Sequence, residues 1–163
     1  MNLAIISDTH LPRGARRLPD ACVRRLRRAE LIIHAGDLVT IAVLEELQAL
    51  GPQMVAVYGN VDDPQARAAL PERAIVDAGG ARIGVIHDAG PARRRLERLR
   101  RRFPDADAVV FGHSHIPLHE RAPDGFQIFN PGSPTERRRA PAHTMGVARV
   151  IEGKIAFRLV ELG

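Results

Sequence analysis

The sequence predicts an α/β fold, and three observations support this prediction. In the first half, short apolar runs alternate with amphipathic helical patterns, which is typical of parallel strands joined by right-handed crossover helices. The second half is richer in short strand patterns separated by Gly-containing turns. With 163 residues the chain can bury a substantial core, so we expect a single domain over residues 1–163.

The first half reads as strand, helix, strand, helix and strand. Cys22 and Leu26 lie on one face of the first helical pattern, and Val43 and Leu47 on one face of the second. The expected elements are a strand at 2–7, a loop at 11–18, a helix at 19–28, a strand at 31–33, a helix at 40–50 and a strand at 54–58. This order favours a parallel sheet.

The second half contains a hairpin signal at Gly79-Gly80 and a helical pattern with Leu96, Leu99 and Phe103 on one face. Arginine runs occupy the rest of this helix, and we expect them to form its solvated face. The expected elements are strands at 74–76 and 82–86, a helix at 93–102, and strands at 108–111, 118–121, 126–129, 146–151 and 155–160.

Composition limits the possible partners and compartments. The net charge of +5 permits contact with anions, but we interpret the excess arginine as solvated helix surface and do not expect a nucleic-acid partner.

Cys22 is the single cysteine, so no internal disulfide can form, and we expect it to be a buried apolar residue. The sequence begins without a basic leader, and no apolar run approaches the roughly 20 residues of a membrane helix. We therefore expect a cytoplasmic protein without membrane contact.

Polar side chains with metal-ligand chemistry follow the expected strands. Asp8 and His10 are spaced i, i+2 and can converge beyond the end of the first strand. The carboxyl ends of strands in an α/β sheet form a common binding crevice, which would bring the other candidates to the same place. The seven candidate metal ligands are Asp8, His10, Asp37, Asn60, His87, His113 and His115.

Seven ligands with one shared carboxylate supply four ligands to each of two metal ions, and Asp37 is the candidate bridge. Carboxylate, amide and imidazole groups without a thiolate favour Mn, Fe, Zn, Ni or Co over Ca or Mg. We take two divalent ions, with manganese as the first choice, as the predicted cofactors. Two such ions about 3.5–4 Å apart can generate hydroxide and stabilise in-line displacement at phosphorus.

Taken in order, these motifs resemble the calcineurin-like metallophosphoesterase superfamily, and in length the chain is most similar to its small single-domain bacterial and archaeal phosphodiesterase branch. The segments that carry the resemblance are Ser7-Asp8-Thr9-His10, Gly36-Asp37, Gly59-Asn60, His87, Gly112-His113-Ser114-His115 and Asn130-Pro131-Gly132-Ser133. The resemblance implies a four-layer αββα sandwich of two mixed β-sheets flanked by helices. It also implies hydrolysis of a small phosphate ester, with a diester preferred over a monoester, by a metal-bridging hydroxide.

The resemblance further implies a division of the ligands between two metals. One metal would take Asp8, His10, Asp37 and His115, and the other would take Asp37, Asn60, His87 and His113. Direct roles in catalysis are implied for Asp37, Asn60 and His113. Asn130 is expected near the mouth of the site, where it would brace a metal ligand.

Two positions depart from the family pattern. Val61 stands where many active members have a His that protonates the leaving group, which leaves the general acid unassigned. Asp88 follows His87 where the branch usually has Gly, and it could either orient a ligand or repel an anionic substrate. Among the other histidines, we expect His34 to be a core or supporting residue, and His119 and His143 to lie at the surface.

Two other functions stay open. A non-catalytic scaffold resembling the eukaryotic retromer subunit would also lack the His after Asn60. A nuclease resembling the repair enzymes of the superfamily would need extra domains. The natural substrate and a possible homo-oligomer are not predicted by the sequence. The substrate pocket is expected at loops 11–18, 61–64, 88–92 and 134–144.

Overall fold

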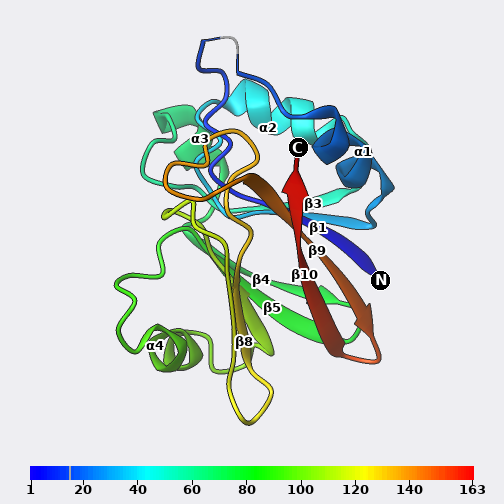
Figure 1. Cartoon of the computed structure of the whole chain (residues 1–163), viewed down its shortest axis with the longest axis vertical. Helices are drawn as coiled ribbons and strands as arrows, with labels where there is room; N and C mark the ends of the chain where they lie inside the picture. The colour runs from blue at the N-terminus through cyan, green and yellow to red at the C-terminus, as the bar shows by residue number, and fades with distance from the viewer. Residues whose placement is uncertain (15) are drawn as a thin grey trace.

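Two five-stranded sheets pack face to face, with helices on their outer surfaces (Figure 1). The computed structural model describes residues 1–14 and 16–163. Sheet 1 contains β1 (Asn2–Ile6), β2 (Leu31–His34), β3 (Gln53–Ala56), β9 (His143–Ile151) and β10 (Lys154–Leu162). Sheet 2 contains β4 (Arg73–Ala78), β5 (Ala81–Ile86), β6 (Ala108–Val110), β7 (Leu118–Arg121) and β8 (Gln127–Asn130). The helices are α1 (Asp20–Arg28), α2 (Ile41–Gln48), α3 (Pro64–Ala69) and α4 (Arg95–Arg102).

Both sheets are mixed, and their parallel strands end at the metal-ligand motifs. Sheet 1 has the order β10-β9-β1-β2-β3, in which β1, β2 and β3 are parallel and β9 runs antiparallel to β1. Sheet 2 has the order β4-β5-β6-β8-β7, in which β5, β6 and β8 are parallel. Because parallel strands end at the same edge of a sheet, the residues after β1, β2 and β3 are brought together, as are those after β5 and β6.

Three groups of buried apolar side chains separate four layers. One group fills the space between the sheets, a second lies beneath α1 and α2, and a third lies beneath α4. Representative members are Ile5, Ile33 and Ile83 between the sheets, Leu26 and Leu47 beneath α1 and α2, and Leu99 and Phe103 beneath α4. The predicted four-layer sandwich is therefore confirmed.

Some element boundaries differ from the prediction. Residues 61–64 were expected in a loop, but α3 begins at Pro64, and the Asp63 carboxylate caps it by accepting a hydrogen bond from Ala66 N at 2.8 Å. The helix expected from Arg93 begins at Arg95, because Arg94 has a left-handed backbone with φ of 55°.

Cys22 is fully buried, as predicted, and burial raises the pKa of its thiol to about 12. Within the described residues, no helix combines the length and apolarity that crossing a membrane requires.

Candidate metal centre

Three buried side chains form what we call the inner half-site: Asp8, His10 and His115. Asp8 Oδ1 lies 3.4 Å from His115 Nε2 and 3.9 Å from His10 Nε2. The carboxylate of Asp37 completes the group, because its Oδ2 lies 3.5 Å from His10 Nε2. Four potential ligand atoms from three strand ends therefore face one small volume.

Asn60, His87 and His113 form what we call the outer half-site. Asn60 Oδ1 lies 3.1 Å from both His87 Nε2 and His113 Nδ1. Asp37 Oδ2 also lies 3.2 Å from His87 Nε2, so this carboxylate contacts both half-sites. The structure thus brings all seven predicted residues together, with Asp37 between the two groups. Their role as metal ligands stays a prediction.

The hydrogen bonds around the histidines favour a cation at the centre. His115 Nδ1 bonds to Glu136 O at 2.6 Å and His87 Nδ1 to Ala35 O at 2.7 Å, so in each ring Nδ1 is the donor. In the neutral rings, Nε2 therefore presents a lone pair to the carboxylates. Several buried polar atoms have no hydrogen-bond partner among the described residues: Asp8 Oδ1, both ring nitrogens of His10, and His115 Nε2. Acceptor atoms that face one another in a buried site fit a bound divalent ion.

The pKa values show how strongly the groups depend on one another. Burial raises the pKa of Asp8 to about 7 and lowers that of His10 to about 4. Burial also opposes ionisation of Asp37, but its contact with His87 and a hydrogen bond from Val61 N lower its pKa to about 2. In the same way, Asp37 and Asp8 outweigh burial and raise the pKa of His87 to about 8.

The backbone at the site is strained. The residues with left-handed φ values are Asp8 (55°), His10 (46°), Asp37 (60°), His113 (69°) and His115 (61°). Such conformations cost non-glycine residues of the order of 1–3 kcal/mol each and cluster at functional sites.

Glycine is required beside two of these turns. A Cβ on Gly112 would overlap Ser7 Oγ and approach Asp8 Oδ2 to 2.7 Å, and a Cβ on Gly59 would overlap Asp37 Oδ1. The backbone at both glycines is therefore approached closely by side chains of the site.

Asp62 supports the site, and the sequence analysis missed its role. Its buried carboxylate accepts hydrogen bonds from the backbone N–H groups of Val39 at 2.6 Å, Gly59 at 2.7 Å and Asp37 at 3.1 Å. Asp62 therefore ties the turn that carries Asp37 to the turn that carries Asn60. The signal in the sequence was its position two residues after Asn60.

The segment after β8 supports the site from sheet 2. Asn130 Nδ2 donates to Gly112 O at 3.0 Å, so Asn130 braces the turn that carries His113, as predicted. Ser133 Oγ donates to Asp8 O at 2.8 Å. Glu136, which the sequence analysis did not single out, places its carboxylate 3.7 Å from His10 Nδ1 and 3.3 Å from Arg16.

His34 and His119 lie where they were predicted, whereas His143 is only partly exposed. His34 is fully buried, and its ring bonds to Thr9 Oγ1 at 3.1 Å and Gly36 N at 3.1 Å. Burial lowers the pKa of His34 to about 3, which makes it a neutral supporting residue. His119 is exposed and bonds to Gln127 Oε1 at 2.8 Å, and His143 is half-buried at the start of β9.

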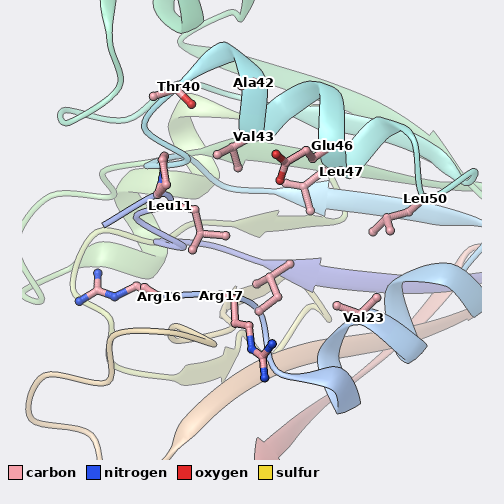
Figure 2. Close-up of a pocket in the computed structure, with 12 residues that line it drawn as sticks. Leu11, Arg16, Arg17, Val23, Thr40, Ala42, Val43, Glu46, Leu47 and Leu50 are labelled. Atoms are coloured by element: carbon pink, nitrogen blue, oxygen red, sulfur yellow. The ribbon is translucent and has the colours of Figure 1, made fainter. Parts of the chain in front are cut away.

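Two pockets lie near the motif loops. One of about 300 Å³ adjoins Asn60, His87 and His113, and its remaining wall includes Tyr58, Arg67, Glu72, Asp88 and Arg102. Among the described residues of the expected substrate loops, only Asp88 lines this pocket. The other pocket, of about 330 Å³, is apolar and lies between α1 and α2, where loop 11–18 contributes Arg16 and Arg17 (Figure 2). It contains none of the seven predicted ligands, so the first pocket is the candidate substrate site.

The comparisons with known proteins agree with the motifs. A family model described as the calcineurin-like phosphoesterase superfamily domain matches residues 1–153. The chain belongs to this superfamily. A probable metallophosphoesterase of Methanothermobacter thermautotrophicus is 33% identical over 100% of this chain and 94% of that protein. A phosphodiesterase of Methanocaldococcus jannaschii is 27% identical over 81% of this chain and 83% of that protein.

Solved structures show the same fold. Vps29 of Entamoeba histolytica, in a complex with zinc, matches with a TM-score of 0.77 and 22% identity over 99% of both chains. Thermotoga maritima TM1076 matches with a TM-score of 0.77 and 27% identity over 99% of both chains. These likenesses, together with the family match, establish a phosphoesterase fold with candidate metal-binding residues in place.

Proposed function

We propose that this phosphoesterase is a dinuclear-metal phosphodiesterase that acts on a small phosphate ester. The observation that carries the proposal is the pair of ligand groups around Asp37, of which the inner one holds buried polar atoms without hydrogen-bond partners among the described residues. Two divalent ions, when bound, would supply positive charge at the phosphoryl oxygens and lower the pKa of water for attack on phosphorus. We take manganese as the first choice, with Ni, Fe, Zn or Co as alternatives.

The protein residues would divide the remaining work. Asp8, His10 and His115 would hold the inner ion, Asn60, His87 and His113 the outer ion, and Asp37 both. Because Asn60 and His113 are exposed and border the pocket of about 300 Å³, the phosphate would arrive from the outer side. The exposed ring of His113 can then donate a hydrogen bond to a phosphate oxygen.

The expected ester class and the expected leaving group rest on two different observations. The curated relative from M. jannaschii is named a phosphodiesterase. At Val61 the side chain cannot donate a proton, so the site favours esters whose leaving groups depart without general-acid help. Asp88 lines the same pocket, and its carboxylate accepts a hydrogen bond from Gly90 N at 2.8 Å, which orients it as part of the wall.

Hydrolysis of bis(p-nitrophenyl) phosphate by protein loaded with Mn, Ni or Mg tests the proposal, with metal content measured on the same samples. We expect two ions per chain and turnover that Asp37→Asn removes. Asp105→Asn, which changes an exposed carboxylate outside the site, is the matched control and should leave the rate unchanged. Equal rates for the wild type and Asp37→Asn would contradict the proposal.

A non-catalytic scaffold is the second candidate function, and Val61 is the observation that favours it. The same experiment separates the two functions. Two bound ions without hydrolysis of any monoester, diester or cyclic nucleotide would favour the scaffold. Metal-dependent cleavage of DNA or RNA in preference to small esters would instead favour a nuclease.

A further inference from the structure

A second concave surface lies at the opposite end of sheet 1 from the metal centre. It is a groove of about 640 Å³ that is lined by the C-terminal half of α1 and by residues of β1, β9 and β10. Asn2, at the start of β1, lines it, whereas Asp8 follows the other end of that strand. A strand rises about 3.3 Å per residue, so the two sites are roughly 17–20 Å apart. A ligand in this groove would not contact the predicted metal ligands.

The groove is bordered by four arginines, and we call it the arginine groove: Arg25, Arg28, Arg149 and Arg158. Arg25 and Arg28 are spaced i, i+3 on α1, so their side chains are neighbours on the helix surface. Arg149 pairs with Ala156 and Val147 with Arg158, so the two strand arginines are diagonal neighbours on one face, about 7–8 Å apart. Two pairs of like charges therefore face one cavity.

These arginines lack acidic partners. Among the described residues, no carboxylate lies within ion-pair distance of any of the four, and no acidic side chain lines the groove. Arg25 alone has an internal bond, from one guanidinium nitrogen to Ala21 O at 2.9 Å. Two arginines near α4 differ, because Arg94, the N-cap of that helix, pairs with Glu97 at 2.8 Å, and Arg100 pairs with Asp124 at 2.6 Å.

Ordinary surface roles account for only part of this arrangement. Basic residues in the last turn complement the helix dipole, which explains the presence of Arg25 and Arg28 on α1. Charged residues on the edge strands of a sheet discourage pairing with another sheet, which explains Arg158 on the edge strand β10. Neither role requires the two pairs to face each other across a cavity. Their mutual repulsion would be relieved by an anion, since a guanidinium group binds carboxylates and phosphates in a bidentate way.

The floor of the groove indicates what kind of anion fits. It is apolar, with Val147 and Ala156 lying between the strand arginines. Ile151 continues the same face of β9 and is 52% exposed. Apolar side chains mixed with arginine are typical of protein–protein interfaces. Phe157 is the aromatic residue of the lining, and its stacking on Phe129 at 4.7 Å commits it to the interior, so no free platform for nucleobases is found among the described lining residues.

We propose that the arginine groove docks an acidic segment of a partner protein, with carboxylates on the four arginines and apolar side chains on Val147, Ala156 and Ile151. Charge complementarity selects the partner, since a second copy of this chain carries a net charge of +5 and would be repelled. The proposal is independent of the phosphodiesterase activity. Docking at this site would leave the metal centre open to substrate.

Fluorescence anisotropy with a short labelled peptide of alternating Glu and Leu tests the proposal. We expect binding that weakens with salt, and a loss of affinity when Ser replaces Leu. The double variant R149E/R158E should weaken binding at least about tenfold. The matched control R93E/R101E makes the same change in net charge on exposed arginines of the α4 region and should weaken it less than about twofold.

Amide chemical shifts in the wild type give a second measurement that needs no variant. We expect peptide-induced shifts at Arg28, Arg149 and Ala156, and none at Asp8 or His115. Equal weakening by the two double variants, or shifts spread over all basic surfaces, would overturn the proposal. So would binding of tripolyphosphate or a single-stranded oligonucleotide in the groove without binding of the peptide.

Discussion

The inner and outer half-sites use similar ligands in opposite surroundings. The inner half-site is sealed, because Asp8, His10 and His115 are each at most 2% exposed. The outer half-site opens to solvent and to the adjoining pocket through Asn60 and His113.

This difference assigns different tasks to the two halves. Buried acceptor atoms without partners are costly, so a metal at the inner half-site would stabilise the fold as well as the reaction. A metal at the outer half-site would exchange more easily and would meet the substrate first. Mutations in the inner half-site should therefore change the stability of the protein, whereas mutations in the outer half-site should change substrate binding and the reaction rate.

The largest effect is expected from Asp8→Asn at the inner half-site. Loss of the carboxylate should reduce the metal content and lower hydrolysis of an activated diester by about 10³-fold or more. Metal-dependent stabilisation, measured as the rise in Tm on adding Mn, should also disappear. A variant that kept two ions and full activity would show that the inner half-site is not a metal site.

Asn60→Ala should have a smaller effect confined to the outer half-site. We expect about one ion per chain to remain, a rate lowered by about 10²-fold, and most of the metal-dependent rise in Tm to be kept. Metal analysis beside thermal unfolding measures both quantities. If Asn60→Ala and Asp8→Asn proved equivalent, the two halves would act as one inseparable unit.

Asp62→Asn should affect both halves moderately, since Asp62 connects the turns of Asp37 and Asn60. We expect metal affinity to fall about 10–100-fold and the free energy of unfolding of the metal-free protein to fall by about 1–3 kcal/mol. Asp63→Asn is the matched control. It changes only the cap of α3 and should leave metal affinity unchanged. Calorimetric metal titration and urea unfolding measure the two effects.

Val61→His places a proton donor beside the outer half-site. For diesters with poor leaving groups we expect a rate increase of about tenfold, and little change for bis(p-nitrophenyl) phosphate, whose leaving group needs no proton. The ratio of the two rates is the quantity to measure. An equal increase for both substrates would point to altered metal binding instead.

The smallest effect concerns pH. Burial raises the pKa of Asp8 from 3.8 to about 7. Between these two pH values, Asp8 is protonated in the metal-free folded protein and ionised in the unfolded protein. Stability of the metal-free protein therefore falls as pH rises through this window, while metal binding is favoured by the same loss of the proton. Since contact with Asp37 raises the pKa of His87 to about 8 despite burial, we expect the metal-induced rise in Tm to grow up to about pH 8 and then level off. A rise in Tm that shrank with increasing pH would contradict this linkage.

Much of the fold and site could be predicted because their signals are local. Short apolar runs located the strands, and helical periodicity located the helices. The polar residues that follow the strands converge because parallel strands end at one edge of the sheet. Asp8 and His10 converge in the inner half-site as predicted, but they do so through left-handed turns at φ of 55° and 46° and not through the alternation of an extended strand. Asp37 contacts both halves, as the count of ligands suggested.

The features that the sequence did not reveal depend on contacts between residues far apart in the sequence, or on carboxylate interactions that have no sequence pattern of their own. Asp62 acts on the N–H groups of Val39 and Gly59, and a carboxylate that binds backbone amides has no distinctive pattern. Glu136 lies in a segment expected to face substrate, yet it approaches His10. The start of α3 could have been found, since Asp63-Pro64 is a typical helix N-terminus.

The position of β1 in the middle of sheet 1 has a consequence for biosynthesis. On one side β1 pairs with β2, which follows closely in the sequence, but on the other it pairs with β9 at His143–Ile151. Ser133, which holds Asp8 O, is also translated late. The nascent chain therefore carries Asp8 and His10 on a half-paired strand until most of the protein has left the ribosome. A metal at the inner half-site would therefore be bound only after residues 115–151 have been translated.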